Sequence, residues 1–258
     1  MPDTVQSVVQ GVLGSTPQLS WPLLDERCGC EVLVKHENHL PTGAFKVRGG
    51  VWYMEQLRRG GENVTGVVAA TRGNHGLSVA FAAGLFGLEA VVVVPEGNSS
   101  FKNRAVSVLG ARLVEHGHDF QEALVHAGEL ARERGLHLVP SFHHWLVEGV
   151  GTYSLEFLNA VDDMDTVYVP VGLGSGICGM LGARDTLGSQ VEIVGVVAAT
   201  LQRFKRIDVL VNNAGGSPHV KAADASNRLS AAIIDLNLTA PLNFASKVND
   251  VMQKQRAG

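Results

Sequence analysis

The sequence predicts an α/β fold built on open, mostly parallel sheets. Of its 258 residues, 45% are apolar and 18% are charged, which is typical of a folded protein and excludes a disordered chain or a coiled coil. Continuous apolar runs such as Ala90–Val94 alternate with helical segments, the pattern of βαβ units in a parallel sheet. Several of these runs lead into glycine-containing loops, where ligands bind in such sheets.

Apolar runs and turn residues mark the expected elements. Strands are predicted at 31–35, 64–70, 90–94, 112–115, 136–139, 166–171 and 191–197. Helices are predicted at 51–59, 77–86, 102–109, 120–134 and 146–160, and one more ends near Thr186. Gly60, Gly87 and Pro95 end three of these elements, because glycine and proline interrupt regular backbone.

Composition limits the partners and the compartment. A net charge of −4 gives no reason to expect nucleic acid or an anionic membrane as a partner. The odd count of cysteines, Cys28, Cys30 and Cys178, favours reduced thiols in a cytosol over a disulfide framework. Residues 1–20 lack the pattern of a signal peptide, and no apolar run is long enough to span a bilayer. We therefore expect a cytoplasmic protein without a membrane partner.

Lys46 stands in an unusual setting, after the Pro41–Gly43 turn and between Phe45 and Val47. Desolvation by Phe45 and repulsion from Arg48 would both lower the pKa of this lysine, and a neutral amine can attack a carbonyl. The alternative is a solvated lysine at the start of a helix.

Two further loops have residues suited to ligand binding. Thr71–Gly76 follows an apolar strand, and its two glycines let the backbone approach a ligand while Asn74 donates or accepts a hydrogen bond. Gly172–Gly176 is a glycine-rich turn ahead of a helix, where free N–H groups and the helix dipole favour phosphate. Such a turn can also serve only close packing, so the two interpretations stay open.

Together the three loops resemble one family. The motifs are Lys35-x-Glu37-x3-Pro41-Thr42-Gly43-Ala44-Phe45-Lys46-x-Arg48-Gly49, then Gly73-Asn74-His75, then Val169-Pro170-Val171-Gly172-Leu173-Gly174-Ser175-Gly176. They are similar to those of fold-type II pyridoxal-phosphate enzymes, above all threonine/serine dehydratases and serine racemase. The resemblance covers roughly residues 19–197, with the motifs in the same order and at fitting spacing.

The resemblance implies a role for each matching position. Lys46 corresponds to the Schiff-base lysine that later accepts the Cα proton, Phe45 to the aromatic residue beside the cofactor, and Asn74 to the asparagine at the ring hydroxyl. The loop that holds the cofactor phosphate corresponds to Gly172, Leu173, Gly174, Ser175 and Gly176. The loop that binds the substrate carboxylate corresponds to Thr71, Arg72, Gly73, Asn74 and His75.

The activity that the resemblance implies is β-elimination, the dehydration and deamination of L-threonine or L-serine to a 2-oxo acid and ammonia. Arg72 departs from the small residue usual in the family, and we expect it either to pair with a substrate carboxylate or to be a solvated loop charge. His75 either touches the site or is a hydrogen-bonded structural histidine. Cys178 is expected to pack as a small residue. His143–His144 lacks a third ligand at metal spacing, so no metal is expected.

The last part of the chain differs from the rest. From Leu201 onward there are eight Lys/Arg and four Asp but no Glu, a shift that suggests a different module. Residues 204–215, with Asn212-Asn213-Ala214-Gly215, and 233–241, with Asn237, resemble the middle of short-chain dehydrogenases/reductases. The glycine-rich dinucleotide turn and the Ser and Tyr-x3-Lys of that family have no counterpart here, so no reductase activity is expected.

These observations give a domain plan and three functions to compare. We predict a larger pyridoxal-phosphate-binding sub-domain at 1–65 and 143–200, a smaller α/β sub-domain at 66–142, and a Rossmann-like βα fragment fused at 201–258. The expected partner is a small amino-acid substrate, and a homodimer stays open. The alternatives to a lyase are a truncated or fused product that binds the cofactor without turnover, and a nicotinamide-dependent short-chain reductase.

Overall fold

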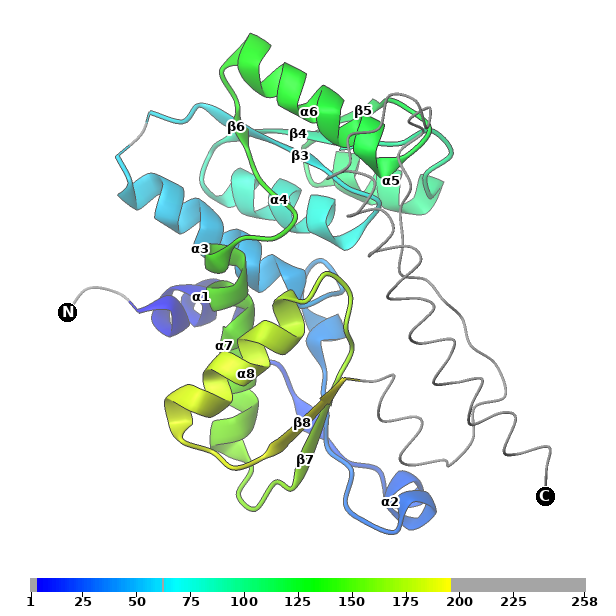
Figure 1. Cartoon of the computed structure of the whole chain (residues 1–258), viewed down its shortest axis with the longest axis vertical. Helices are drawn as coiled ribbons and strands as arrows, with labels where there is room; N and C mark the ends of the chain where they lie inside the picture. Colours follow the sequence, from blue (N-terminus) through cyan, green and yellow to red (C-terminus); the bar gives the residue numbers. More distant parts are fainter. Residues whose placement is uncertain (1–3, 62, 196–258) are drawn as a thin grey trace, which may run out of the picture.

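The computed structural model describes residues 4–61 and 63–195, and it confirms the predicted α/β class with parallel sheets (Figure 1). A four-stranded parallel sheet in the order β5-β4-β3-β6 forms the first body. Its strands are β3 (Gly66–Ala70), β4 (Glu89–Val94), β5 (Arg112–Glu115) and β6 (His137–Leu138). Three helices connect them, namely α4 (Asn74–Leu85), α5 (Ser100–Val108) and α6 (Phe120–Arg134).

Helices cover both faces of this sheet, which explains why its central strands are continuous apolar runs. On one face Val67 and Val92 pack in a cluster with α4 and α5, and on the other Val68 and Val91 pack against α6. All five residues of β3 are buried as a result, as expected of a parallel strand covered on both sides.

A second, two-stranded parallel sheet lies in the other body (Figure 1). It consists of β7 (Thr166–Val169) and β8 (Glu192–Gly195), and it packs with α7 (His144–Ala160) and α8 (Ser175–Leu187). Val167 and Val169 are buried in this cluster, whereas Tyr168 on the opposite face is 53% exposed. The parallel direction places the loop after β7, Gly172–Gly176, at the carboxyl end of the sheet.

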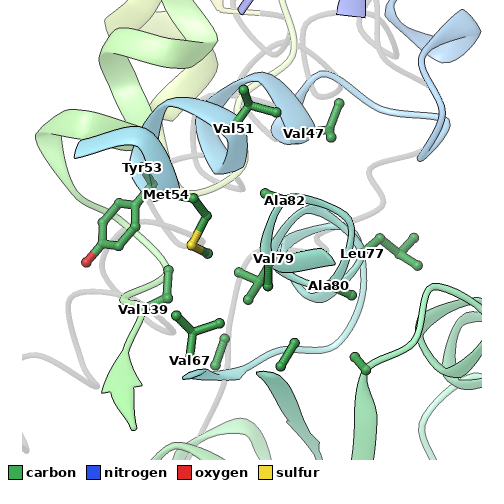
Figure 2. Packing of buried hydrophobic residues seen from close by; sticks show 14 of the residues in the cluster. Val47, Val51, Tyr53, Met54, Val67, Leu77, Val79, Ala80, Ala82 and Val139 are labelled. Carbon is green, nitrogen blue, oxygen red and sulfur yellow. The ribbon is translucent and has the colours of Figure 1, made fainter. Parts of the chain in front are cut away.

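Helix α3 (Lys46–Arg59) joins the two bodies, because it packs on α4 on one side and on α7 on the other. Val47, Val51 and Met54 of α3 share a buried cluster with Val79 and Ala82 of α4, and Figure 2 shows Met54 lying toward Val79. The prediction that this helix starts at Val51 was wrong by five residues, since Lys46 is its first residue.

The physical reason lies in the pair Gly49–Gly50, which looks like a helix break in the sequence. A Cβ on Gly49 would come within 2.7 Å of the Leu146 carbonyl oxygen, and one on Gly50 within 2.3 Å of the Ser78 Oγ. These glycines allow α3 to approach both neighbouring helices closely. Tertiary packing therefore outweighs their poor helix propensity.

The N-terminal segment completes the described structure. Two of its short elements form an antiparallel pair, and neither of its helices was predicted from the sequence. The elements are α1 (Val5–Leu13), β1 (Gln18–Leu19), α2 (Pro22–Cys28), β2 (Val34–Lys35) and a 3-10 turn, η1 (Glu37–His39). Within 4–61 and 63–195 no helix combines the length and the apolar character needed to cross a membrane. The dehydrogenase-like motifs at 204–215 and 233–241, with Asn237, lie outside the described residues, and the predicted sub-domain boundaries stay predictions.

Candidate functional site

A small internal cavity lies where α3, α4 and α8 begin. It has a volume of about 10 Å³, room for about one water molecule. The side chains around it are those of Lys46, His75, Ser141, Leu146, Val150 and Ser175. Lys46 and Ser175 are the first residues of α3 and α8, and His75 is the second of α4. Three helix N-termini therefore meet here, and their free N–H groups and dipoles favour negatively charged ligands.

The Lys46 amine is held in a partly desolvated position. Its Nζ lies 5.8 Å from the centroid of the Phe45 ring, and burial lowers the pKa of Lys46 from its ordinary value. A larger share of the amine is therefore neutral and nucleophilic at a given pH than for a surface lysine. The predicted direction is confirmed. Lys46 does start a helix, as the alternative expected, but it is half-buried rather than solvated.

The predicted contribution of Arg48 to this shift is wrong. Arg48 is fully buried, and its guanidinium donates to Glu37 at 2.7 Å and to Glu156 at 2.7 Å. Its charge is thus balanced by two carboxylates, so it does not act on Lys46 as an isolated cation. Lys35 also pairs with Glu156, at 2.8 Å.

This buried network anchors the first turn of α3, which carries Lys46 at its start. Burial by itself would raise the pKa of Glu156, but hydrogen bonds from Arg48 and Lys35 outweigh burial and lower it. Lys35, Glu37 and Arg48 belong to the first sequence motif. Glu156 lies on α7, 108 residues beyond Arg48, and no local pattern marked it.

The loop before α4 is shaped by Thr71, whose Oγ1 accepts hydrogen bonds from the N–H of Gly73 at 2.9 Å and of Gly76 at 3.3 Å. The N–H groups of Asn74 and His75 then open the helix, where the backbone offers no intrahelical acceptor. Such groups are suited to binding a carboxylate.

His75 is buried, and its Nε2 has no hydrogen-bond partner among the described residues. Burial, with the charge of Lys46, lowers the pKa of His75 to about 4, although a hydrogen bond to the backbone of Val139 opposes the shift. The ring is therefore neutral near pH 7. Both interpretations of His75 hold in part, because it hydrogen-bonds the backbone of Val139 and is also among the residues around the cavity.

The turn Gly172–Gly176 forms the third side of the site, next to the start of α3 and the loop before α4. Gly174 has φ 103°, a conformation that favours glycine, and it caps α8. A Cβ on Gly176 would lie 3.6 Å from the Phe45 ring, so this ring lies against the turn. Tyr153 on α7 donates to the Gly176 carbonyl at 3.4 Å. The structure thus brings Phe45, Lys46, Ser175 and Gly176 together.

Other predicted site residues lie toward the surface. Gly172, Leu173, Asn74 and Arg72 are exposed. Cys178, expected to pack as a small residue, is also exposed. Among residues 4–61 and 63–195, no group of three His, Cys, Asp or Glu side chains is arranged to hold a metal.

A larger hollow of about 540 Å³ lies at the other end of β7 and β8, next to Asp162, Asp163 and Asp165. It contains none of the predicted site residues and no lysine or histidine. In parallel sheets ligands bind at the carboxyl ends of the strands, and this hollow is at the amino ends. We therefore place the functional site at the smaller cavity beside Lys46.

Comparison with known proteins shows which family the chain belongs to. The family described as pyridoxal-phosphate dependent enzyme matches residues 9–233. The chain belongs to this family. The mitochondrial threonine dehydratase of Saccharomyces cerevisiae is 32% identical over 267 residues, covering 98% of this chain and 46% of that protein. The biosynthetic L-threonine dehydratase IlvA of Haemophilus influenzae is 35% identical over 182 residues, covering 70% and 35%.

Among solved structures, the processed form of threonine deaminase isoform 2 from Solanum lycopersicum aligns with a TM-score of 0.68 and 32% identity. That alignment covers 72% of this chain and 52% of the tomato protein. The chain thus spans about a third to a half of the length of these curated relatives. The family match continues to residue 233, into the segment that the sequence predicted to be a dehydrogenase fragment, and these comparisons give that fragment no support.

The residues of the site fit pyridoxal phosphate, the cofactor of the family. Lys46 offers a primary amine with a lowered pKa, and the α8 N-terminus with its glycine turn offers a phosphate site. His75 is among the residues around the same cavity, and its buried Nε2 has no partner among the described residues. The enclosed space is small, but Asn74, Gly172 and Leu173 on the adjoining loops are exposed.

Proposed function

We propose that this chain catalyses the pyridoxal-phosphate-dependent β-elimination of a β-hydroxy amino acid, L-threonine or L-serine, to a 2-oxo acid and ammonia. The observation that carries the proposal is the desolvated amine of Lys46 at the meeting point of three helix N-termini. The threonine dehydratases among the relatives support this choice of substrate.

Each group of residues around the cavity has a role in this proposal. Ser175 and the N–H groups of the Gly172–Gly176 turn would hold the cofactor phosphate, and Phe45 would pack beside the ring. The cofactor supplies an aldehyde for amines and a ring that accepts electrons from Cα. The N–H groups of Asn74 and His75 would bind the substrate carboxylate, because they open α4 with no acceptor of their own.

Lys46 performs the proton transfer. Its neutral amine accepts the proton from the substrate Cα, and a pKa below the ordinary lysine value keeps that amine available near neutral pH. Leu146 and Val150 keep this part of the site apolar, which helps to maintain the lowered pKa. The β-hydroxyl leaves as water, and hydrolysis of the resulting enamine gives the 2-oxo acid and ammonia.

The experiment is spectroscopic. Adding pyridoxal phosphate to the full chain is expected to produce a visible absorbance band that shifts on adding L-threonine or L-serine, with release of a 2-oxo acid. Lys46→Ala is expected to lose the band. Lys46→Arg is the matched variant, because it keeps the positive charge without an amine able to bond the aldehyde. A band that persists in both variants would overturn the role of Lys46.

Two outcomes separate the remaining possibilities. A band without 2-oxo acid would favour a product that binds the cofactor without turnover. The fusion of a short-chain-dehydrogenase-like fragment at 201–258 also stays a proposal, carried only by the motifs at 204–215 and 233–241. Titration with NADH and NADPH tests whether the chain binds a nicotinamide cofactor, and we expect no tight binding.

A further inference from the structure

The hydroxyl of Ser78 joins helix α4 to helix α3 at the residue that carries the reactive amine. Its Oγ donates a hydrogen bond of 2.7 Å to the backbone carbonyl of Lys46. A serine inside a helix often gives its single hydroxyl proton to a carbonyl of its own helix, one turn back, but Ser78 gives it to a different helix. Ser78 is 1% exposed, so water does not compete for this proton.

Gly50 gives Ser78 access to this carbonyl. It lies one turn after Lys46 in α3, and a Cβ there would come within 2.3 Å of the Ser78 Oγ. A side chain at position 50 would therefore displace the hydroxyl that reaches Lys46. The glycine and the serine act together, because one leaves the space that the other fills.

The start of α3 has little to hold it locally. Phe45 precedes the helix, and its ring has no atom that could accept a hydrogen bond from the first N–H groups. Arg48 anchors α3 to two carboxylates, but it does so through its side chain. Ser78 is bonded to the backbone of Lys46 itself. This bond therefore limits the movement of the residue from which the amine extends.

The same bond relates the amine to the proposed binding site of the substrate. Asn74 and His75, whose N–H groups are proposed to bind the substrate carboxylate, are the first two residues of α4, and Ser78 is the fifth. One buried hydrogen bond thus connects the helix that would hold the carboxylate to the backbone that carries the amine. Proton transfer from Cα requires an approach to about 3 Å, and a misplacement of about 1 Å can cost about 10²-fold in rate.

We propose that Ser78 is a positioning residue for the proton transfer to Lys46. It lies outside the set of described residues around the cavity, so it acts through the backbone of Lys46. The inference rests on the proposed function, since it concerns the same proton transfer. Loss of the hydroxyl should leave the binding of cofactor and substrate almost unchanged, and it should slow the step in which the amine takes the Cα proton.

The first measurement needs neither cofactor nor turnover. Acetic anhydride labels neutral amines, so the pH dependence of Lys46 labelling in the cofactor-free chain, followed by mass spectrometry, gives the pKa of this amine. Burial lowers that pKa, and a looser first turn of α3 would let water reach the amine. Ser78→Ala is therefore expected to raise the pKa of Lys46 toward its ordinary value. His75 and Arg48 are unchanged in the variant, so the shift reports the position of the amine.

The second measurement uses the full chain with pyridoxal phosphate. With L-threonine or L-serine as substrate, Ser78→Ala is expected to lower kcat by about tenfold or more and to change KM by about twofold or less. The visible band should persist. The isotope effect on kcat with the Cα-deuterated substrate should be as large as in the unchanged protein or larger, because the slowed step is proton removal.

Ser107→Ala is the matched control, since the Ser107 hydroxyl donates to the carbonyl of Asn103 in its own helix, α5. It should leave the pKa of Lys46, kcat and the isotope effect unchanged. An unchanged pKa of Lys46 or an unchanged kcat in Ser78→Ala would overturn the inference, as would a lower kcat with a smaller isotope effect. Absence of the visible band in the unchanged protein would instead count against the proposed function. Labelling of the cofactor-free chain would then still decide whether Ser78 holds the amine in place.

Discussion

Two groups of cations lie on the segments that also supply the site, and they differ in how their charge is balanced. On one side Arg48 and Lys35 are buried and paired with Glu37 and Glu156. On the other side Arg72 and Lys102 lie at the loop before α4 with no acidic partner in the described chain. Removing one partner of a buried, paired charge is strongly destabilising, because it leaves the other charge buried and uncompensated, whereas a charge on an exposed loop without an acidic partner balances no buried group. We therefore expect substitutions in the two groups to differ sharply in their effect on stability.

The largest expected effect on stability comes from the paired group, Arg48 and Lys35 with Glu37 and Glu156. Arg48→Met removes a guanidinium that is fully buried and leaves Glu37 and Glu156 facing each other without it. We expect the free energy of unfolding to fall by about 3–5 kcal/mol, measured by urea denaturation. The control is Arg58→Met, since the Arg58 side chain is 65% exposed and pairs with Glu55. That variant should lose about 1 kcal/mol or less, and equal losses in both variants would contradict the distinction.

The next effect concerns His75, whose Nε2 has no partner. Its pKa is lowered to about 4, from 6.5 ordinarily, so the unfolded chain binds this proton more readily than the folded chain. Stability is therefore fully present above about pH 6.5 and is lost as the pH falls toward about 4, by up to about 3 kcal/mol. His75→Gln should show a correspondingly shallower dependence of unfolding free energy on pH. Parallel curves for the two proteins would contradict the assignment.

A third prediction tests the close packing of α7 against the part of α3 that carries Arg48. A Cβ on Gly149 would come within 2.6 Å of the Arg48 carbonyl oxygen and 2.8 Å of the Gly49 Cα. Because backbone atoms cannot easily move aside, Gly149→Ala should destabilise the protein by about 1–3 kcal/mol. Gly182→Ala on α8 is the control, with no atom within 4 Å of the new Cβ. It should stabilise by about 0.5–1 kcal/mol, and thermal unfolding of both variants checks the opposite signs.

Local signals account for the parts of the fold that could be predicted. The predicted bounds of β5 and α6 are confirmed to the residue. For α6 the reason is local, because Asp119 caps its start and Gly135 adopts the left-handed conformation at its end. The start of α3 was missed because Gly49 and Gly50 act through neighbouring helices, which sequence spacing does not show.

The site shows the same difference between features that local sequence predicts and features that depend on distant contacts. Three motifs identified the loops that carry Lys46, His75 and Ser175, which meet at one cavity. The sequence could not predict how Arg48 is balanced, because Glu156 comes from α7, 108 residues away. Lys102 was missed for the same reason, since its contact with Gly73 exists only after β3 and β4 pair. Local motifs thus locate reactive groups, while charge balance depends on contacts distant in sequence.

The smallest effect on stability is expected from Gly73→Ala, next to Arg72 and Lys102. The new Cβ would lie 2.8 Å from the Lys102 Nζ, but this is the flexible end of a long side chain, which can move aside. We expect the free energy of unfolding to change by about 0.5 kcal/mol or less. Urea denaturation of the variant checks this value. Gly11→Ala on α1, with no atom within 4 Å of its Cβ, is the control and should stabilise the protein by about 0.5–1 kcal/mol. A loss above about 1 kcal/mol in Gly73→Ala would mean that the Lys102 side chain cannot move aside.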